Sequence, residues 1–377
     1  PMRFIKHVYK IHTYAQDGRL FEGKTPVSAF LNSSYDGSFI AGLMELRYIQ
    51  SLPVERIINY FESHGFTLKK PTAHKLMEKA SSLFENLYKC IRQTALSDPY
   101  KAADETYYKI LVPEKNSKGK GVRKGYLWVV VGINTRMIYL LYDDGSRSEK
   151  VILNELGGCK GIIQSDGYSP YRKLESDAYP HITRIPCLQH IKRKFIDCGE
   201  DDPDAKRIVE MINTLYQNEH KHKIGVDGWT VEQNLVHRKK YAPDILGEIK
   251  DVLDDIEERG DLLPKSELKE AITYLRNEWN AVVDIFNYGD TYLDNNIVER
   301  MNRYISLSRK NSLFFGSHKG AERGAILYTI ALTCRMNKVN LFEYLTDIIN
   351  RTAEWQPNTP LEKYRQLLPD RWEKAND

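Results

Sequence analysis

The chain has 377 residues, of which 41% are hydrophobic and 28% charged, and its formal net charge is +4. Such a length suits two or three domains of roughly 100–200 residues each, and the composition is ordinary for a globular protein. No apolar run approaches the roughly 18 residues of a membrane helix, and no signal peptide is recognised, so no membrane partner is expected. Five scattered cysteines without a CxxC pair indicate a reduced, cytoplasmic compartment.

The charge is spread unevenly along the chain. Asp244–Asp261 carries eight acids against two bases, whereas Glu299–Arg323 carries six bases against two acids. The run Arg184–Lys194 has four bases and no acid. Basic islands on a near-neutral chain favour a nucleic-acid partner, although net charge alone establishes none.

The first quarter of the chain is basic and then helical. Residues 1–35 read as a basic, poorly periodic arm, and residues 36–98 as a helical region. A helix begins at Pro53, a turn follows at His64, and a second helix begins near Pro71, which is the outline of a DNA-binding helix-turn-helix. The alternative is a plain helical hairpin with lysines on its exposed face. The lysines expected to contact DNA are Lys69, Lys70, Lys75 and Lys79.

The middle of the chain has an α/β pattern. Apolar runs bounded by turn residues predict strands at Ala102–Val112, Gly125–Ile133, Met137–Tyr142, Gly161–Gln164 and Ile182–Pro186, with a helix near Glu149–Leu156. Three successive antiparallel strands, a helix and a further strand are the start of an RNase H-like mixed sheet. Asp104 lies in the first strand and Asp166 follows the fourth, so the two carboxylates are expected side by side on neighbouring central strands.

This sheet belongs to a core that the sequence divides in two. Residues 99–198 form its first part and residues 289–340 its second part. Residues 199–288 show long helical patterns without a strand signal, which predicts an all-α insertion. Residues 341–377 are expected to form a short helix and a charged tail. The predicted class is therefore α/β, an RNase H-like mixed sheet with an all-α insertion, preceded by a helix-turn-helix region.

Residues 290–316, which read DTYLDNNIVERMNRYISLSRKNSLFFG, predict a helix that carries charges on an apolar background. The Asp-Asn-Asn run that ends at Asn296 suits a helix start, because such side chains accept free backbone N–H groups. Glu299 then lies within the helix. Its plain interpretation is a solvated i,i+4 pair with Arg303, and the alternative is a carboxylate directed at the sheet.

Six motifs follow one another along the chain: ADET at 103–106, GYLWVVVG at 125–132, QSDGYSPY at 164–171, CLQHIKRKF at 187–195, LDNNIVER at 293–300 and SRKNSLFFGSHKGAERGAILYTIALTCRMNKVN at 308–340. In this order and spacing they resemble DDE transposases of the insertion sequence 66 family, over roughly residues 25–370. The resemblance implies an RNase H-like catalytic core, two-metal phosphoryl transfer on DNA ends, and a triad of Asp104, Asp166 and Glu299. Family members commonly carry a cysteine-rich segment ahead of the helix-turn-helix, whereas this sequence has no cysteine before Cys90.

Physical chemistry supports the same triad. Two-metal phosphodiester cleavage needs three or four carboxylates around ions about 3.5–4 Å apart. Mg²⁺ prefers such oxygen ligands, so two Mg²⁺ ions are expected, with Mn²⁺ as a substitute. Asp294, Glu299 and Glu322 are the three acids that could join Asp104 and Asp166. Because Asp294 suits a helix cap and Glu322 opens the next helix, we expect the carboxyl groups of Asp104, Asp166 and Glu299 to converge within about 8 Å. Glu322 is expected farther away, in a structural ion pair.

Cys187 and His190 are three residues apart at a predicted helix start, a spacing that can suggest zinc. Two ligands do not make a site, so a structural or DNA-facing role is favoured for His190. The other basic residues expected to contact DNA are Lys192, Arg193, Lys194, Arg300, Arg303, Arg309, Lys310 and Arg323.

The resulting interpretation is an insertion-sequence transposase that cleaves at element ends and joins the freed 3′-OH to target DNA. Its expected partners are double-stranded DNA of the ends and the target, a second copy of the chain in a synaptic complex, and accessory proteins of the same element. Its expected place is the bacterial cytoplasm, at the nucleoid. The alternatives are a non-catalytic DNA-binding or regulatory relative that uses the helix-turn-helix, and a nuclease that cleaves without joining.

Overall fold

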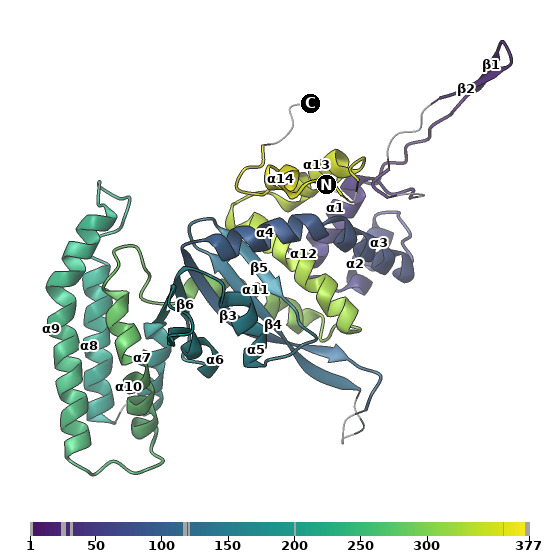
Figure 1. The fold of residues 1–377 in the computed structure, drawn as a ribbon. Coiled ribbons are helices and arrows are strands. Elements are labelled where there is room, and N and C mark those ends of the chain that lie inside the picture. The colour runs from purple at the N-terminus through teal and green to yellow at the C-terminus, as the bar shows by residue number, and fades with distance from the viewer. Residues whose placement is uncertain are drawn as a thin grey trace.

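A five-stranded sheet lies at the centre of the protein, with helices around it, as the ribbon in Figure 1 shows. The computed structural model describes residues 3–23, 28–30, 33–115, 119, 121–199, 201–356 and 358–373. Parts of the predicted N-terminal arm and of the C-terminal tail lie outside these residues. None of the described helices is long and apolar enough to cross a membrane.

The sheet consists of β3 (Tyr100–Leu111), β4 (Val122–Gly132), β5 (Met137–Leu141), β6 (Gly161–Ser165) and β7 (Ile182–Pro186). The strands lie in the order β5-β4-β3-β6-β7. The pairs β5–β4 and β4–β3 are antiparallel, and the pairs β3–β6 and β6–β7 are parallel. All five predicted strands are therefore present, with small shifts at their ends. Trp128–Val131 of β4 is buried on both faces, which explains why this strand is a continuous apolar run.

Two helices cover one face and one edge of the sheet. α11 (Asn296–Asn311) packs across β3, and α12 (His318–Met336) runs along β5. The hydroxyl groups of Thr329 and Thr333 accept hydrogen bonds from the backbone N–H groups of Leu140 (2.9 Å) and Ile138 (3.2 Å). Helix α12 thereby satisfies the polar groups of an edge strand that would otherwise be free to pair with another chain.

Four helices form the N-terminal helical region: α1 (Gly37–Tyr48), α2 (Val54–Ser63), α3 (Lys70–Leu83) and α4 (Glu85–Ser97). The two helices predicted after Pro53 and near Pro71 are therefore present as α2 and α3. Both bury their apolar faces in the main core, including Phe61 and Leu76. Recognition of DNA by this pair of helices stays a prediction.

The N-terminal arm contains a hairpin that was not predicted from the sequence. β1 (Thr13–Gln16) pairs with β2 (Arg19–Glu22) around Asp17 and Gly18, whose φ angles are 49° and 71°. An Asp-Gly pair favours this type of turn because both positions need a positive φ. Every residue of the two strands is exposed, and Figure 1 shows the hairpin projecting from the body of the protein. The arm therefore contains regular structure that the sequence analysis did not predict.

A second hydrophobic core lies under the helices beside β7. α7 (Leu188–Asp197), α8 (Pro203–Glu219), α9 (Val231–Glu258) and α10 (Glu267–Ile285) contribute to it, together with Tyr100 and Ile185 of the sheet. The described residues between 199 and 288 contain helices and no strand, as the sequence pattern predicts. Figure 1 shows this helical block at the side of the sheet opposite α12.

The remaining elements are α5 (Glu149–Leu156), α6 (Ser169–Arg172), a short 3₁₀ turn at Lys173–Glu175, α13 (Leu341–Thr352) and α14 (Leu361–Arg365). The C-terminal segment is more than a surface tail. Tyr364, Leu367 and Leu368 are buried in the main core, and the Tyr344 hydroxyl donates to the carbonyl oxygen of Leu367 at 2.7 Å.

Candidate active site

Asp104 on β3 and Asp166, which directly follows the neighbouring strand β6, are called the aspartate pair below. The parallel pairing of β3 with β6 ends where Ala102 lies opposite Gln164, two residues before each aspartate, and the charge of Asp166 contributes to the raised pKa of Asp104. Neighbouring strands are about 4.8 Å apart. Burial, followed by the negative charges of Glu105 and Asp166, raises the pKa of Asp104 to about 8. Without a cation the folded protein therefore favours the protonated form of Asp104, because its surroundings do not compensate the charge of the ionised carboxylate.

Asp104 is held by a residue of α11 that was not selected from the sequence. The side-chain amide of Asn302 donates to Asp104 Oδ2 at 2.6 Å, and the backbone N–H of Glu105 donates to Oδ1 at 2.8 Å. Asn302 follows Glu299 by three residues, so the two side chains share one face of the helix. That spacing was the available signal. Among the described residues, the amide oxygen of Asn302 has no hydrogen-bond partner although it is buried.

The turn that presents Asp166 is held by the helical block. The guanidinium of Arg184, wholly buried on β7, donates to the carbonyl oxygen of Asp166 (2.7 Å) and to Glu278 Oε2 on α10 (2.5 Å). The backbone N–H of Gly167 donates to the Tyr274 hydroxyl of the same helix at 2.9 Å. A Cβ atom at Gly167 would lie 2.5 Å from that hydroxyl oxygen, so the close approach requires glycine. Helix α10 therefore sets the position of Asp166.

The start of α11 is fastened between β3 and the β7–α7 junction. The side-chain amide of Asn295 donates to the carbonyl oxygen of Ala103 (3.0 Å), and its backbone N–H donates to Cys187 Sγ (3.2 Å). The backbone N–H of Leu188 donates to the carbonyl oxygen of Leu293 at 2.9 Å. Glu299, one turn into the helix, is thereby brought to the β7–α7 junction.

The predicted cap of α11 is only partly as expected. Asp294 Oδ1 accepts from the backbone N–H of Asn296 at 3.1 Å, as a capping carboxylate would. The side chain of Asn295, in contrast, makes no capping hydrogen bond to the helix, because its amide is used to bind β3.

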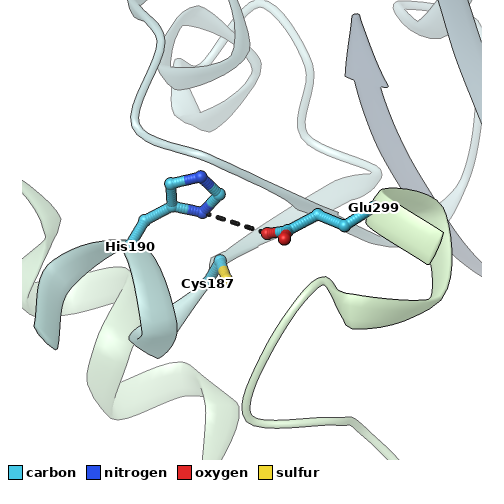
Figure 2. A group of neighbouring side chains, drawn as sticks. All are labelled: Cys187, His190 and Glu299. Carbon is cyan, nitrogen blue, oxygen red and sulfur yellow. Dashed lines mark ion pairs between the residues drawn. The ribbon is translucent and has the colours of Figure 1, made fainter. Parts of the chain in front are cut away.

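Glu299 faces Cys187 and His190, and these three residues are called the Cys–His–Glu cluster below. Glu299 Oε1 lies 3.6 Å from His190 Nδ1, and one ligand atom from each of the three side chains lies within 4.8 Å of the others. Figure 2 shows the three side chains pointing toward one another. Within the described part of the chain, no other group of three or more Cys, His, Asp and Glu side chains is as compact. Burial raises the pKa of the Cys187 thiol to about 12.

The cluster shows which side chains Glu299 contacts, whereas its place in a carboxylate triad is still a prediction. Cys187 and His190 were paired from the sequence, but Glu299 was missed as a third member because it lies far along the chain. In the described structure Glu299 contacts His190 rather than forming the i,i+4 pair with Arg303, so the plain interpretation of Glu299 is wrong. Convergence of the Asp104, Asp166 and Glu299 carboxyl groups within about 8 Å stays a prediction.

Glu322 is exposed on α12, just after the first turn of that helix. Burial is the main cause of the raised pKa of Tyr142, which follows β5, and the charge of Glu322 adds to it, which places Glu322 toward the β5 edge of the sheet. The ion pair in this region belongs to its neighbour, since Arg323 Nη1 lies 2.8 Å from Glu78 Oε1 of α3.

A hollow of about 280 Å³ opens beside Asp166. Arg193 and Lys194 of α7 line it together with His190 and with Arg147, which was not selected from the sequence. Arg147 Nε donates to Glu105 Oε1 at 3.0 Å, so this cation is anchored to the residue that follows Asp104. Two of the predicted DNA contacts therefore lie next to the aspartate pair.

The other predicted DNA contacts are more scattered. Lys69, Lys70, Lys75, Arg300, Arg303 and Lys310 are exposed, whereas Lys79, Lys192, Arg309 and Arg323 are partly buried. Some of these cations already have partners within the protein. Lys70 pairs with Glu55, and Arg309 donates to the carbonyl oxygen of Tyr107 and stacks on its ring. Arg309 therefore anchors α11 to β3, and contact with DNA would be an additional role.

The fold and the site together define a mixed α/β protein with an acidic centre and basic side chains beside it. The model of the Transposase IS66 family matches residues 32–323, and the chain belongs to this family.

Three curated relatives from Sinorhizobium fredii are similar to the chain over most of its length. They are the uncharacterized proteins y4jD (25% identical over 88% of this chain), y4hP (25% over 86%) and y4qI (26% over 96%). The matched regions cover 65%, 60% and 68% of those proteins, so the chain spans about two thirds of the length of the relatives it matches.

Proposed function

We propose that this protein is a DNA transposase that cleaves the ends of an insertion sequence and joins them to target DNA. The observation that carries the proposal is the aspartate pair at the centre of the sheet, where burial and neighbouring acids raise the pKa of Asp104, in a member of a transposase family. The strand order β5-β4-β3-β6-β7, antiparallel and then parallel, supports an RNase H-like catalytic core.

The donor set favours hard divalent cations. Asp104, Asp166 and Glu299 offer carboxylate oxygens, which suit two Mg²⁺ ions or Mn²⁺ as a substitute. Two observations fit this assignment: the pKa of Asp104 is raised to about 8 by burial and by neighbouring acids, and Glu299 Oε1 is buried without a hydrogen-bond partner in the described chain. Bound at this site, such ions polarise the phosphodiester and activate water.

The reaction has two balanced steps. In the first, water attacks a phosphodiester at the element end, and the broken P–O bond leaves a 3′-OH. In the second, that 3′-OH attacks a phosphodiester of the target, so one P–O bond forms as another breaks. The protein would position the scissile phosphates and neutralise their charge, a role proposed for Arg147, Arg193 and Lys194, which line the hollow beside Asp166.

DNA outside the scissile phosphates would be held by the remaining predicted cations. Exposed Arg300, Arg303 and Lys310 on α11 are proposed to contact phosphates near the catalytic centre. Lys69, Lys70, Lys75 and Lys79 would do so at the α2–α3 pair, acting as a helix-turn-helix. A synaptic complex holds two ends, so a homodimer on DNA is proposed, with accessory proteins of the same element as further partners at the nucleoid.

A strand-transfer gel tests the function directly. Labelled duplexes that carry the element ends are incubated with the chain and Mg²⁺ or Mn²⁺, and a transposase gives both cleaved and joined products. Asp104→Asn, Asp166→Asn and Glu299→Gln should each lower cleavage by roughly a thousandfold or more, since removing a ligand takes away several kcal/mol of transition-state stabilisation. Glu322→Gln, an exposed acid of α12, serves as the matched control.

The products distinguish the candidate functions. Binding without cleavage would favour the non-catalytic regulatory relative, and cleavage without joining would favour a nuclease. If a triad variant cleaves within about tenfold of the parent rate, the substituted residue is not a metal ligand, because losing a ligand should lower the rate further.

A further inference from the structure

We propose that the Cys–His–Glu cluster is a binding site for a zinc ion. Its three protein ligands would be the sulfur of Cys187, Nδ1 of His190 and a carboxylate oxygen of Glu299 (Figure 2). The proposal stands on the geometry of these side chains and does not depend on the proposed transposase activity.

The donor types select the metal. Zinc binds thiolate, imidazole and carboxylate groups together, whereas Mg²⁺ requires oxygen ligands. Three protein ligands leave the fourth tetrahedral position open to water or to a further group. The cluster therefore differs in kind from the aspartate pair, which offers oxygen atoms alone.

The separations are close to those of an assembled site. Zinc bonds of about 2.0–2.3 Å in a tetrahedron place ligand atoms roughly 3.3–3.8 Å apart. The distance of 3.6 Å between His190 Nδ1 and Glu299 Oε1 is already in this range, and all three ligand atoms lie within 4.8 Å of one another. Shifts of about 1 Å would bring the three atoms to such separations.

Two buried polar atoms of the cluster suit a bound cation. His190 Nδ1 and Glu299 Oε1 are both buried, and neither has a hydrogen-bond partner in the described part of the chain. Buried polar atoms without partners are rare and need an explanation. The backbone N–H of Asn295 donates to Cys187 Sγ at 3.2 Å, an interaction of the kind that supports a metal-bound sulfur. One zinc ion would bind both of these atoms and use this support.

The shared residue predicts a functional consequence that rests on the proposed function. Glu299 belongs both to this cluster and to the proposed carboxylate triad. A zinc ion on Cys187 and His190 would hold the Glu299 carboxylate at the β7–α7 junction and withdraw it from the aspartate pair. Zinc is therefore expected to inhibit cleavage that depends on Mg²⁺.

Metal binding can be measured without any DNA. The full chain is stripped with a chelator and titrated with Co²⁺, whose bond to a cysteine sulfur gives a near-ultraviolet charge-transfer band, and with Zn²⁺ by calorimetry. One site per chain with that band is expected. Cys187→Ser should remove the band. His190→Gln should weaken Zn²⁺ binding by at least about a hundredfold, because losing a residue that only supports a ligand already weakens metal binding by up to about that factor.

Matched controls keep the test decisive. Cys198→Ser changes a half-exposed cysteine at the end of the same helix, and it should keep the band and the affinity. Because Cys187 is buried, thermal unfolding checks that its variant folds, and His190→Gln supplies an independent variant at a half-buried position. The proposal is overturned if the parent chain shows no cobalt–sulfur band, or if Cys198→Ser removes it while Cys187→Ser keeps it.

Failure of this proposal can be told apart from failure of the proposed function. A cobalt–sulfur band in a chain that never cleaves DNA would keep the zinc site and remove the transposase assignment. Cleavage in a chain without the band would do the reverse. If the chain both binds zinc and cleaves DNA, added zinc should lower the cleavage rate of the parent and leave that of His190→Gln nearly unchanged. An equal decrease in the two proteins would overturn the proposal that zinc and the triad share Glu299.

Discussion

The aspartate pair and the Cys–His–Glu cluster lie near the same end of the sheet but are assembled in different ways. Strand register brings Asp104 and Asp166 together, because β3 and β6 are direct neighbours in the sheet. The cluster instead joins a residue of α11 to the β7–α7 junction through the contacts of Asn295 and neighbouring backbone groups. The first arrangement follows from the sheet itself, whereas the second depends on how two helices pack. Their donors differ accordingly, with oxygen alone in one and sulfur, nitrogen and oxygen in the other.

The largest effect is expected from Arg184, which links the two regions. It donates to the carbonyl oxygen of Asp166, and its strand leads directly into Cys187. Arg184→Met would leave the buried carboxylate of Glu278 without its main partner, so the free energy of unfolding should fall by roughly 3–5 kcal/mol. Urea unfolding measures this decrease.

Arg172→Met is the matched control for this experiment. Its guanidinium lies 3.9 Å from Glu278 and its side chain is 35% exposed, so a decrease below about 1 kcal/mol is expected. Equal decreases in the two variants would mean that Arg184 does not hold the turn of Asp166.

The next effect is a pH dependence of the free energy of unfolding that comes from the aspartate pair and not from the Cys–His–Glu cluster. The raised pKa of Asp104 means that the folded protein holds a proton there which the unfolded chain has released. Without metal, the free energy of unfolding should therefore fall as pH rises from about 4 to about 8. Asp104→Asn should remove roughly 2–4 kcal/mol of this fall, allowing for partial exposure to solvent, and part of it should remain because the pKa of Glu105 is also raised by burial.

Urea unfolding at several pH values measures this slope, with His190→Gln as a control from the other region. Saturating Mg²⁺ should flatten the slope in the parent, since the ion binds the deprotonated carboxylate. A parent whose stability rises over this range would contradict the assignment of uncompensated charge to the aspartate pair.

A smaller effect tests how the helical block positions Asp166. In Gly167→Ala the new Cβ meets the Tyr274 ring and hydroxyl group, so a decrease of about 1–3 kcal/mol in unfolding free energy and weaker Mg²⁺ binding are expected. Gly158→Ala is the control, because nothing lies within 4 Å of its added Cβ. Zinc or cobalt binding by the cluster should not change in either variant. A stable Gly167→Ala protein with unchanged Mg²⁺ affinity would show that α10 does not set this turn.

The smallest effect concerns DNA held away from both regions. Neutralising Lys75 and Lys79 of α3 to Gln should weaken duplex binding at all sequences and reduce the salt slope by roughly one unit for each phosphate that a lysine no longer neutralises. Binding measured at several salt concentrations gives the slope. Lys89→Gln on α4, whose lysine already pairs with Glu85, is the control. An unchanged slope would make α2 and α3 a helical hairpin with another purpose.

Sequence patterns alone predicted the strands and helices of the sheet region and the neighbouring positions of Asp104 and Asp166. Apolar runs such as Trp128–Val131 and the turn residues between them are local signals, and a parallel neighbour for β3 then places the two acids. Six short motifs in order also identified the family. The hairpin at Asp17-Gly18 was missed, because its strands are wholly exposed and carry no alternation of burial.

The surroundings of Glu299, in contrast, come from long-range packing that no local sequence pattern shows. Its contact with His190 joins residues 109 positions apart and depends on the use of the Asn295 amide to bind β3 instead of capping α11. The same is true of Arg184, Tyr274 and Glu278, which hold the turn of Asp166 from another strand and from α10. Helical periodicity shows which face of a helix is apolar, but it carries no information about which distant segment that face meets. The packing of α11 and α10 against the sheet supplies that information, because it alone brings those side chains within bonding distance.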